Sequence, residues 1–166
     1  LIKSYYISAS VTLNRGITFD GKHFFMTKFN NEGLYKFSQV FDLLEIQTIS
    51  GLNDTMHGID FHNNRFVISA RLGSKIDSFG RAGYVLNSVA TAYSNKAYND
   101  VCVVGKYVYV LNGQSLVIDM YDLNIKLLNT WDTPTPSNNP AAMAYDGEYF
   151  WFVTNSPSNL FQCILK

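Results

Sequence analysis

Apolar and polar positions along this chain recur with a constant period of 42 residues, four times over and without an insertion. Each period opens with a small residue and an apolar-x-apolar triplet, continues through a tight turn, and then enters an aromatic-rich apolar run. The four copies of the opening segment are residues 16–19, 58–61, 100–103 and 142–145. A repeat of this length predicts one supersecondary unit per period, packed against its neighbours.

Each period contains the pattern of several short strands. The turns after the opening segments contain Gly or Asn, which accept the positive φ of a two-residue hairpin. The run after each turn is apolar at consecutive positions, which favours a strand buried on both faces. These second strands are expected at 23–26, 65–68, 107–110 and 149–152. Third strands are expected at 34–37, 76–79, 116–119 and 160–163, and fourth strands at 43–46, 85–88 and 127–130.

Four short strands in each repeat are typical of the blades of a β-propeller. The last repeat lacks its fourth strand, whereas residues 1–4 lie 42 residues ahead of 43–46 in the same register. We therefore predict an all-β fold: a four-bladed β-propeller of four-stranded antiparallel blades, forming a single domain over residues 1–166. Its repeats start near 16, 58, 100 and 142. The amino-terminal strand, residues 1–8, would close the last blade and pair its open edge.

The chain length agrees with a closed ring of four blades. Four periods take 168 residues, and the chain has 166. Aromatic residues make up 15% of the chain, and their bulk suits the wide wedges between blades that diverge by about 90°. Two alternatives stay open. The chain could be a half-ring that pairs with a second copy to give eight blades, or a piece of a larger propeller.

Composition narrows the classes of partner. Acidic and basic residues balance at 13 each without a basic stripe, so we expect no nucleic acid partner. The apolar runs are only as long as strands, so we expect no membrane insertion. Cys102 and Cys163 fall in different blades, which predicts two buried thiols and no disulfide.

The carboxy-terminal half resembles the YVTN type of β-propeller repeat. The strand ends Tyr-Val-Tyr-Val-Leu-Asn at 107–112 and Phe-Trp-Phe-Val-Thr-Asn-Ser at 150–156 carry the similarity, together with the Pro-x-x-x-Ala-x-x-Asp-Gly pattern at 140–147. The resemblance is strong over 100–166 and loose over 1–99, where Thr27-Lys28 and Ser69-Ala70 replace Thr-Asn. It implies a cell-surface or interaction module, and therefore binding more than catalysis.

Candidate ligand-binding residues come from two sets of loops at one mouth of the central channel. One set enters the first strand of each blade, and the other joins the second strand to the third. Amide, imidazole and basic side chains there would suit an anionic or sugar ligand. These candidates are Arg15, Lys28, His57, Arg71, Asn99, Asn112 and Asn155. The structural alternative is that they cap backbone groups in the loops.

Trp131 is a further candidate, because it stands at the base of the Pro-rich segment 131–140. An exposed indole there would be a recognition platform. The alternative is that the ring packs against the neighbouring blade.

Metal and catalytic signals are sparse. His57 and His62 lie five residues apart on one expected strand and so point to opposite faces, which argues against a shared metal ion. Asp60 is the carboxylate expected to face the axis, paired with a basic residue, a cation or the backbone. No nucleophile elbow, phosphate-binding loop, zinc-ligand pair or close carboxylate couple is visible in the sequence. We therefore expect no catalytic residue, no metal and no cofactor.

The function that this pattern favours is a non-enzymatic recognition module. We expect it to bind a glycan or a protein receptor through the mouth loops, in an extracellular setting, at a cell surface or on a virion. A neutral, Asn- and Tyr-rich composition agrees with that expectation. The alternatives are an architectural module of a larger assembly such as a viral spike, and an enzyme with an ion-dependent site at the channel mouth.

Overall fold

The computed structural model of the chain describes residues 14–28, 33–49, 55–70, 75–82, 85–90, 97–133, 140–155 and 158–165. Every regular element in these ranges is a β-strand, and the strands form four separate antiparallel sheets. The described part of the chain contains no helix that could span a membrane.

Each sheet is one blade, with its strands side by side in chain order. Blade 1 consists of β1 (Asn14–Phe19), β2 (Phe24–Lys28), β3 (Gly33–Phe37) and β4 (Leu43–Thr48). Blade 2 consists of β5 (Met56–His62), β6 (Arg65–Ala70), β7 (Lys75–Gly80) and β8 (Val85–Ala90). Blade 3 consists of β9 (Tyr98–Val104), β10 (Tyr107–Asn112), β11 (Val117–Asp122) and β12 (Leu127–Asp132). Blade 4 consists of β13 (Pro140–Tyr145), β14 (Phe150–Thr154) and β15 (Leu160–Cys163).

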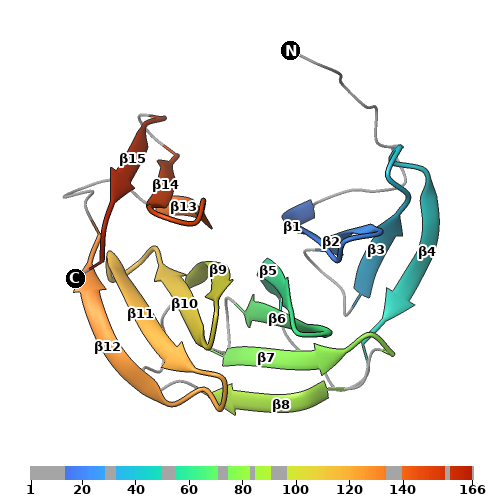
Figure 1. The fold of residues 1–166 in the computed structure, drawn as a ribbon, viewed down its shortest axis with the longest axis horizontal. Helices are drawn as coiled ribbons and strands as arrows, with labels where there is room; N and C mark the ends of the chain where they lie inside the picture. The colour runs from blue at the N-terminus through green and yellow to red at the C-terminus, as the bar shows by residue number, and fades with distance from the viewer. Residues whose placement is uncertain are drawn as a thin grey trace.

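The four blades are arranged around a common axis, with β1, β5, β9 and β13 innermost and β4, β8 and β12 at the rim (Figure 1). The prediction of an all-β, four-bladed β-propeller with antiparallel blades is confirmed. The inner strands begin at residues 14, 56, 98 and 140, so the 42-residue period of the sequence is the spacing of the blades. The strand proposed to close the last blade, residues 1–8, lies outside the described residues.

The core is divided into wedges between successive blades. One cluster joins blade 1 to blade 2 through Phe25, Leu34 and Ile59. Two further clusters fill the spaces between blades 2 and 3 and between blades 3 and 4. Both faces of each middle blade are therefore covered, which explains why strands such as β6 are apolar at consecutive positions.

The hairpins between the first and second strands use the predicted turn residues. Gly21, Gly105 and Gly147 have φ values of 89°, 60° and 108°, and Asn63 and Asn64 take 48° and 62° in the remaining blade. Only glycine and, at higher cost, asparagine adopt this left-handed region readily. Of the two cysteines, Cys102 is buried, whereas Cys163 is half-buried, and both are free thiols. The prediction of two buried thiols is thus correct for Cys102 alone.

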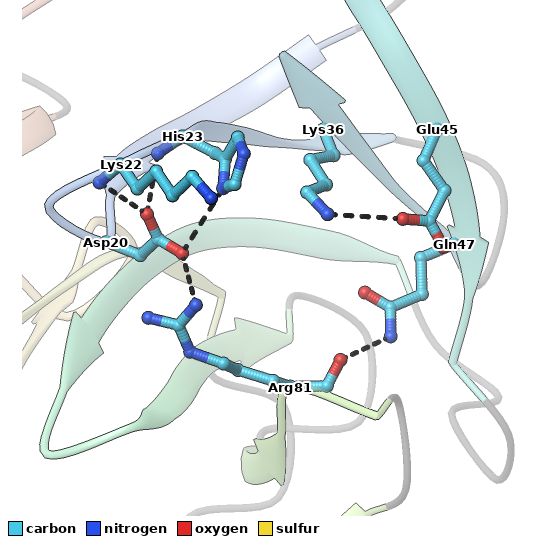
Figure 2. Close-up of polar contacts among 7 residues, drawn as sticks. All are labelled: Asp20, Lys22, His23, Lys36, Glu45, Gln47 and Arg81. Carbon is cyan, nitrogen blue, oxygen red and sulfur yellow. Dashed lines mark hydrogen bonds and ion pairs between the residues drawn. The ribbon is translucent and has the colours of Figure 1, made fainter. Parts of the chain in front are cut away.

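A polar clamp joins the hairpin of blade 1 to blade 2 (Figure 2). Asp20 Oδ1 accepts hydrogen bonds from the backbone N–H groups of Lys22 and His23 at 2.8 and 2.6 Å. Asp20 Oδ2 lies 2.7 Å from Arg81 Nη1. The carbonyl of Arg81 accepts a hydrogen bond from Gln47 Nε2 at 2.7 Å, so Arg81 is held by both the hairpin and the rim strand of blade 1.

The pKa of the Asp20 carboxyl lies below its ordinary value. Burial acts to raise it, but the N–H groups of His23 and Lys22 and the positive charge of Arg81 together outweigh burial. A carboxyl with a lowered pKa in the folded state stabilises the fold above its ordinary pKa, and that contribution is lost as the pH falls through the lowered value.

We predict that Asp20→Asn lowers the free energy of unfolding by about 1–2 kcal/mol at pH 7, because a charge-assisted bond between blades is lost. The difference from the wild type should shrink as the pH falls below about 4. Urea titrations at pH 7 and pH 3 measure both effects. Lys36→Met is the matched control, because it removes the exposed 3.4 Å pair with Glu45 inside blade 1 and should cost less than about 0.5 kcal/mol. Equal losses in the two variants would contradict a special role for the clamp.

Candidate functional site

One end of every blade brings the two predicted loop sets together. The register pairs Asn14 with Lys28, Met56 with Ala70, Tyr98 with Asn112, and Pro140 with Thr154. The start of each inner strand and the end of its neighbour therefore lie at the same edge of the blade. We call this edge the mouth end of the propeller.

A β-bulge interrupts each inner strand at the mouth end. The register shifts between Asn14 and Ile17, between Met56 and Ile59, opposite Leu111 and Asn112 in blade 3, and between Pro140 and Ala142. Bulges leave an unpaired residue and re-aim its side chain, and they occur often beside functional sites. The unpaired positions coincide with the predicted entry-loop residues Arg15, His57 and Asn99, which are one period apart.

Hydroxyl groups of the second strands satisfy the backbone at two of these bulges. The N–H of Gly16 donates to Thr27 Oγ1 at 2.8 Å, and the N–H of Gly58 donates to Ser69 Oγ at 3.0 Å. The Thr27 hydroxyl in turn donates to the carbonyl of His57 at 3.0 Å, so it also ties blade 1 to the bulge of blade 2. The bulges are therefore fixed parts of the structure.

The predicted contact residues occupy different environments at the mouth end. Arg15 and Asn155 are exposed, whereas His57 is buried. Asn99 is half-buried, and its Nδ2 donates to the carbonyl of Pro140 at 2.6 Å, which bridges blades 3 and 4. Asn112 is fully buried, and its Oδ1 accepts from the N–H groups of Gln114 and Ser115, as a turn-capping side chain does.

Three of the predicted residues do not contribute to the described mouth end. Arg71 and the side chain of Lys28 lie outside the described residues. Trp131 is on the rim strand β12, half-buried, with its ring stacked 6.3 Å from that of Tyr109. Trp131 therefore packs on its own blade. Its role as a recognition platform, like ligand binding by the other candidates, stays a prediction.

The inner strands approach one another very closely just inside the bulges. A Cβ atom added to Gly16 would lie 2.6 Å from the carbonyl oxygen of His57, and one added to Gly58 would lie 2.5 Å from the Cα of Asp100. Side chains cannot be accommodated at such distances, so glycine is required at both positions. The third copy of this position is Asp100, whose carboxylate sits against Gly58.

Two aspartates link the inner strands across the blades. Asp60 Oδ1 accepts from the Thr18 hydroxyl at 3.2 Å, and its Oδ2 accepts from the N–H of Val103 at 2.7 Å. Asp100 Oδ2 accepts from the N–H of Met143 at 2.8 Å. These contacts therefore link β1, β5, β9 and β13 in turn. Of the partners considered for Asp60 from the sequence, the structure shows the backbone, and it adds the hydroxyl of Thr18.

The axial setting changes the acid–base behaviour of two groups. Burial, and to a smaller extent the charge of Asp60, raises the pKa of Asp100 to about 7, although the N–H groups of Met143 and Val101 act to lower it. Burial and the charges of Asp60 and Asp100 raise the pKa of the Cys102 thiol to about 12. Asp100 therefore exchanges its proton near neutral pH, whereas Cys102 stays a thiol.

The sequence reasoning placed Asp60 at the axis but missed Asp100 beside it. The signal was present, because Asp100 occupies the period position that holds Gly16, Gly58 and Ala142 in the other blades. A carboxylate at a position otherwise reserved for small residues must be buried or must displace a neighbouring strand. Among the described residues, no group of three or more His, Cys, Asp or Glu side chains is placed to hold a metal ion.

Comparison with solved structures shows the same architecture in enzymes. The chain is similar to virginiamycin B lyase from Staphylococcus aureus, solved as a catalytically inactive His-to-Ala variant with quinupristin. The TM-score is 0.73 at 16% identity, over 98% of this chain and 56% of the lyase chain. It is also similar to glutaminyl cyclase from Myxococcus xanthus, with a TM-score of 0.73 at 14% identity, over 90% of this chain and 71% of the cyclase chain.

A computationally designed protein, Ika4, matches with a TM-score of 0.64 at 12% identity, over 99% of this chain and 98% of its own. No protein-family model and no curated protein matches the chain. The similarity to YVTN repeats thus stays a resemblance, while the propeller fold is shown. The chain spans only about half the length of the lyase chains.

These comparisons correct the prediction that the protein is not an enzyme. That prediction rested on the absence of familiar catalytic motifs and on the resemblance to YVTN repeats, which implies binding more than catalysis. The solved structures that share this fold include a lyase and a cyclase, and catalytic groups on a propeller can come from several blades. The absence of a familiar motif from the sequence is therefore no evidence against catalysis in a propeller.

We predict that Gly58→Ala destabilises the fold by about 1–3 kcal/mol, because the added methyl group collides with the backbone of Asp100. Gly80→Ala is the control: its Cβ would meet only Leu86 Cδ1 at an ordinary 3.9 Å, so its effect should stay within about 0.5 kcal/mol. Thermal unfolding measures both. A Gly58→Ala variant as stable as the control would contradict the close approach of β5 and β9.

Asp100 should also make stability depend on pH. Its pKa is raised from 3.8 to about 7 on folding, so between these values the folded state holds a proton that the unfolded chain has released. The wild-type protein should therefore lose stability as the pH rises from about 4 to 7, by up to about 1.4 kcal/mol per pH unit. Asp100→Asn should remove this slope. Parallel slopes of the unfolding free energy for the two proteins would refute the raised pKa.

Proposed function

We propose that this propeller is an acid–base enzyme of the lyase or cyclase kind, with Asp100 as the group that transfers the proton. The observation that carries the proposal is the half-buried Asp100 carboxyl, whose pKa is raised to about 7 at the axis. A general acid or base works best when its pKa is near the operating pH. Burial and a second carboxylate nearby are the means by which proteins reach that pKa.

The chemistry of the similar structures supports this assignment. Elimination by a lyase and ring closure by a glutaminyl cyclase both require proton transfer to or from the reacting molecule. Asp100 follows directly after the bulge of blade 3, and its carboxylate sits against Gly58, the residue next to His57. A substrate at the mouth end would therefore meet a titrating carboxyl beside a region that contains an imidazole and amide groups.

Several residues of the mouth end would define the shape and polarity of the substrate site. Asn99 is held to blade 4 through Pro140, so its side chain is already ordered. Arg15 is exposed at the equivalent position of blade 1. A rigid amide and an exposed guanidinium favour a polar or anionic substrate, in agreement with the ligand class expected from the sequence.

The proposal is tested with two probes, quinupristin and a peptide with an amino-terminal glutamine. We predict that the wild-type protein converts at least one of them, with a pH-rate profile whose midpoint lies near 7, and that Asp100→Asn loses at least about 100-fold in rate. Chromatography coupled to mass spectrometry follows both reactions. Asp132→Asn, an exposed carboxyl on β12, is the matched control and should retain full activity. Failure to convert either probe, or an unchanged rate in Asp100→Asn, would contradict the proposal.

The finer interpretation from the sequence, binding of a glycan or a protein partner at the mouth end, is a second proposal. It is supported by the exposure of Arg15 and Asn155 at the same end of blades 1 and 4. The same set of variants separates the two proposals. If the mouth end is a recognition surface, Asp100→Asn should still bind the ligand, whereas Arg15→Ala or Asn155→Ala should not. If it is an acid–base site, Asp100→Asn should lose the reaction rate, whereas Arg15→Ala and Asn155→Ala should retain it.

A further inference from the structure

The first and last blades each expose apolar side chains on the face that no other described blade covers, although Tyr35 and Phe37 on the same face of blade 1 are only 1% exposed. Blade 1 presents Ile17 and Phe19 on β1, which are 51% and 43% exposed; we call this the leading face. At the positions equivalent to Ile17 in the other blades, one period apart, Ile59, Val101 and Met143 are only 4%, 3% and 7% exposed. The same position is thus buried wherever a blade precedes it.

Blade 4 presents the opposite face in the same state. Val153 on β14 and Leu160 on β15 are 42% and 63% exposed; we call this the trailing face. The residues equivalent to them in blades 1 to 3 are fully buried. They are Thr27, Ser69 and Leu111 for Val153, and Leu34, Ile76 and Ile118 for Leu160.

The leading and trailing faces correspond to the two sides of the interface between successive blades, which the molecule forms three times. Between blades 1 and 2, Ile59, which is equivalent to Ile17 of the leading face, packs in one cluster with Leu34, which is equivalent to Leu160 of the trailing face. Val101 and Ile76 share the next cluster, and Met143 and Ile118 share the third. Ile17 and Leu160 are the copies of these positions that lack such a neighbour within the described chain. The leading and trailing faces are therefore complementary, because equivalent residues already pack together between successive blades.

We propose that the leading face of one copy of this chain packs on the trailing face of a second copy. The same contact in the reverse direction then closes a ring of two copies with two identical seams. A head-to-tail contact gives a finite assembly only when its rotation closes, and a two-fold axis along the propeller axis is the smallest solution. Apolar side chains at more than 40% exposure on two separate faces give such a seam its driving force.

The lengths of similar proteins favour a second copy as the occupant. This chain matches only 52–58% of the lyase chains, although 92–98% of it is aligned. Two copies of this chain together would have about the length of such a lyase chain. The inference does not depend on the chemistry of Asp100, because none of the seam residues belongs to the axial pair.

The test is the mass of the wild-type chain and of face variants by sedimentation equilibrium at about 100 µM, where even a micromolar interface is nearly saturated. We expect the wild-type protein at twice its chain mass of 18.8 kDa. Ile17→Asp on the leading face and Leu160→Asp on the trailing face should each give monomers, because every seam then contains one charged face. Leu86→Asp is the matched control. Leu86 is a 54% exposed apolar residue on the rim strand β8, away from both faces, and its variant should stay a dimer.

Mixing the two monomeric variants tests directly whether the leading face binds the trailing face. The unaltered trailing face of Ile17→Asp can pack on the unaltered leading face of Leu160→Asp, so the mixture should regain dimers with one intact seam. Phe19→Asp and Val153→Asp repeat the experiment if either first variant fails to fold, as judged by circular dichroism. A monomeric wild-type protein would overturn the proposal, because the faces would then be covered in some other way or not at all. A mixture that stays monomeric, or dissociation of Leu86→Asp, would also overturn it.

Discussion

The close approach of the inner strands at the axis is the constraint on which the rest of this structure depends. Blades of a propeller share no backbone ladder with one another, so side chains and apolar wedges must hold them together. Here Asp60 and Asp100 supply acceptors for the N–H groups of Val103 and Met143 on the next strands. Gly16 and Gly58 leave the space that β5 and β9 need. The blades are thus linked at their narrowest point by hydrogen bonds to carboxylates.

The same constraint produces the chemistry of the site. A carboxylate that is partly enclosed between strands loses part of its contact with water, and a second carboxylate nearby adds repulsion. Asp100 therefore titrates near neutrality, while the neighbouring thiol of Cys102 stays protonated. Structure and reactivity have one origin, because the groups that join the blades are also the groups whose proton affinity the burial has changed.

Particular residues show how far sequence reasoning reached. The period of 42 predicted inner strands that start near 16, 58, 100 and 142, two residues after their observed starts, and it identified the turn glycines. It also placed Asp60 at the axis. Asp100 escaped notice because its neighbours in space, Gly58 and Met143, lie some 42 residues away along the chain. The packing of Trp131 was left open by the sequence for a related reason: its stacking partner Tyr109 belongs to another strand of the same blade.

The repeat pattern alone was enough to specify strands, turns, blade number and the mouth end, because those depend on local periodicity and on the register between adjacent segments. Burial between blades, the recurrent bulges, the raised pKa of Asp100 and the uncovered state of Ile17 and Leu160 were decided only in three dimensions. Equivalent positions of the repeat have different exposures depending on which blade lies beside them. A periodic sequence cannot encode that difference, since it arises from neighbours that meet through space.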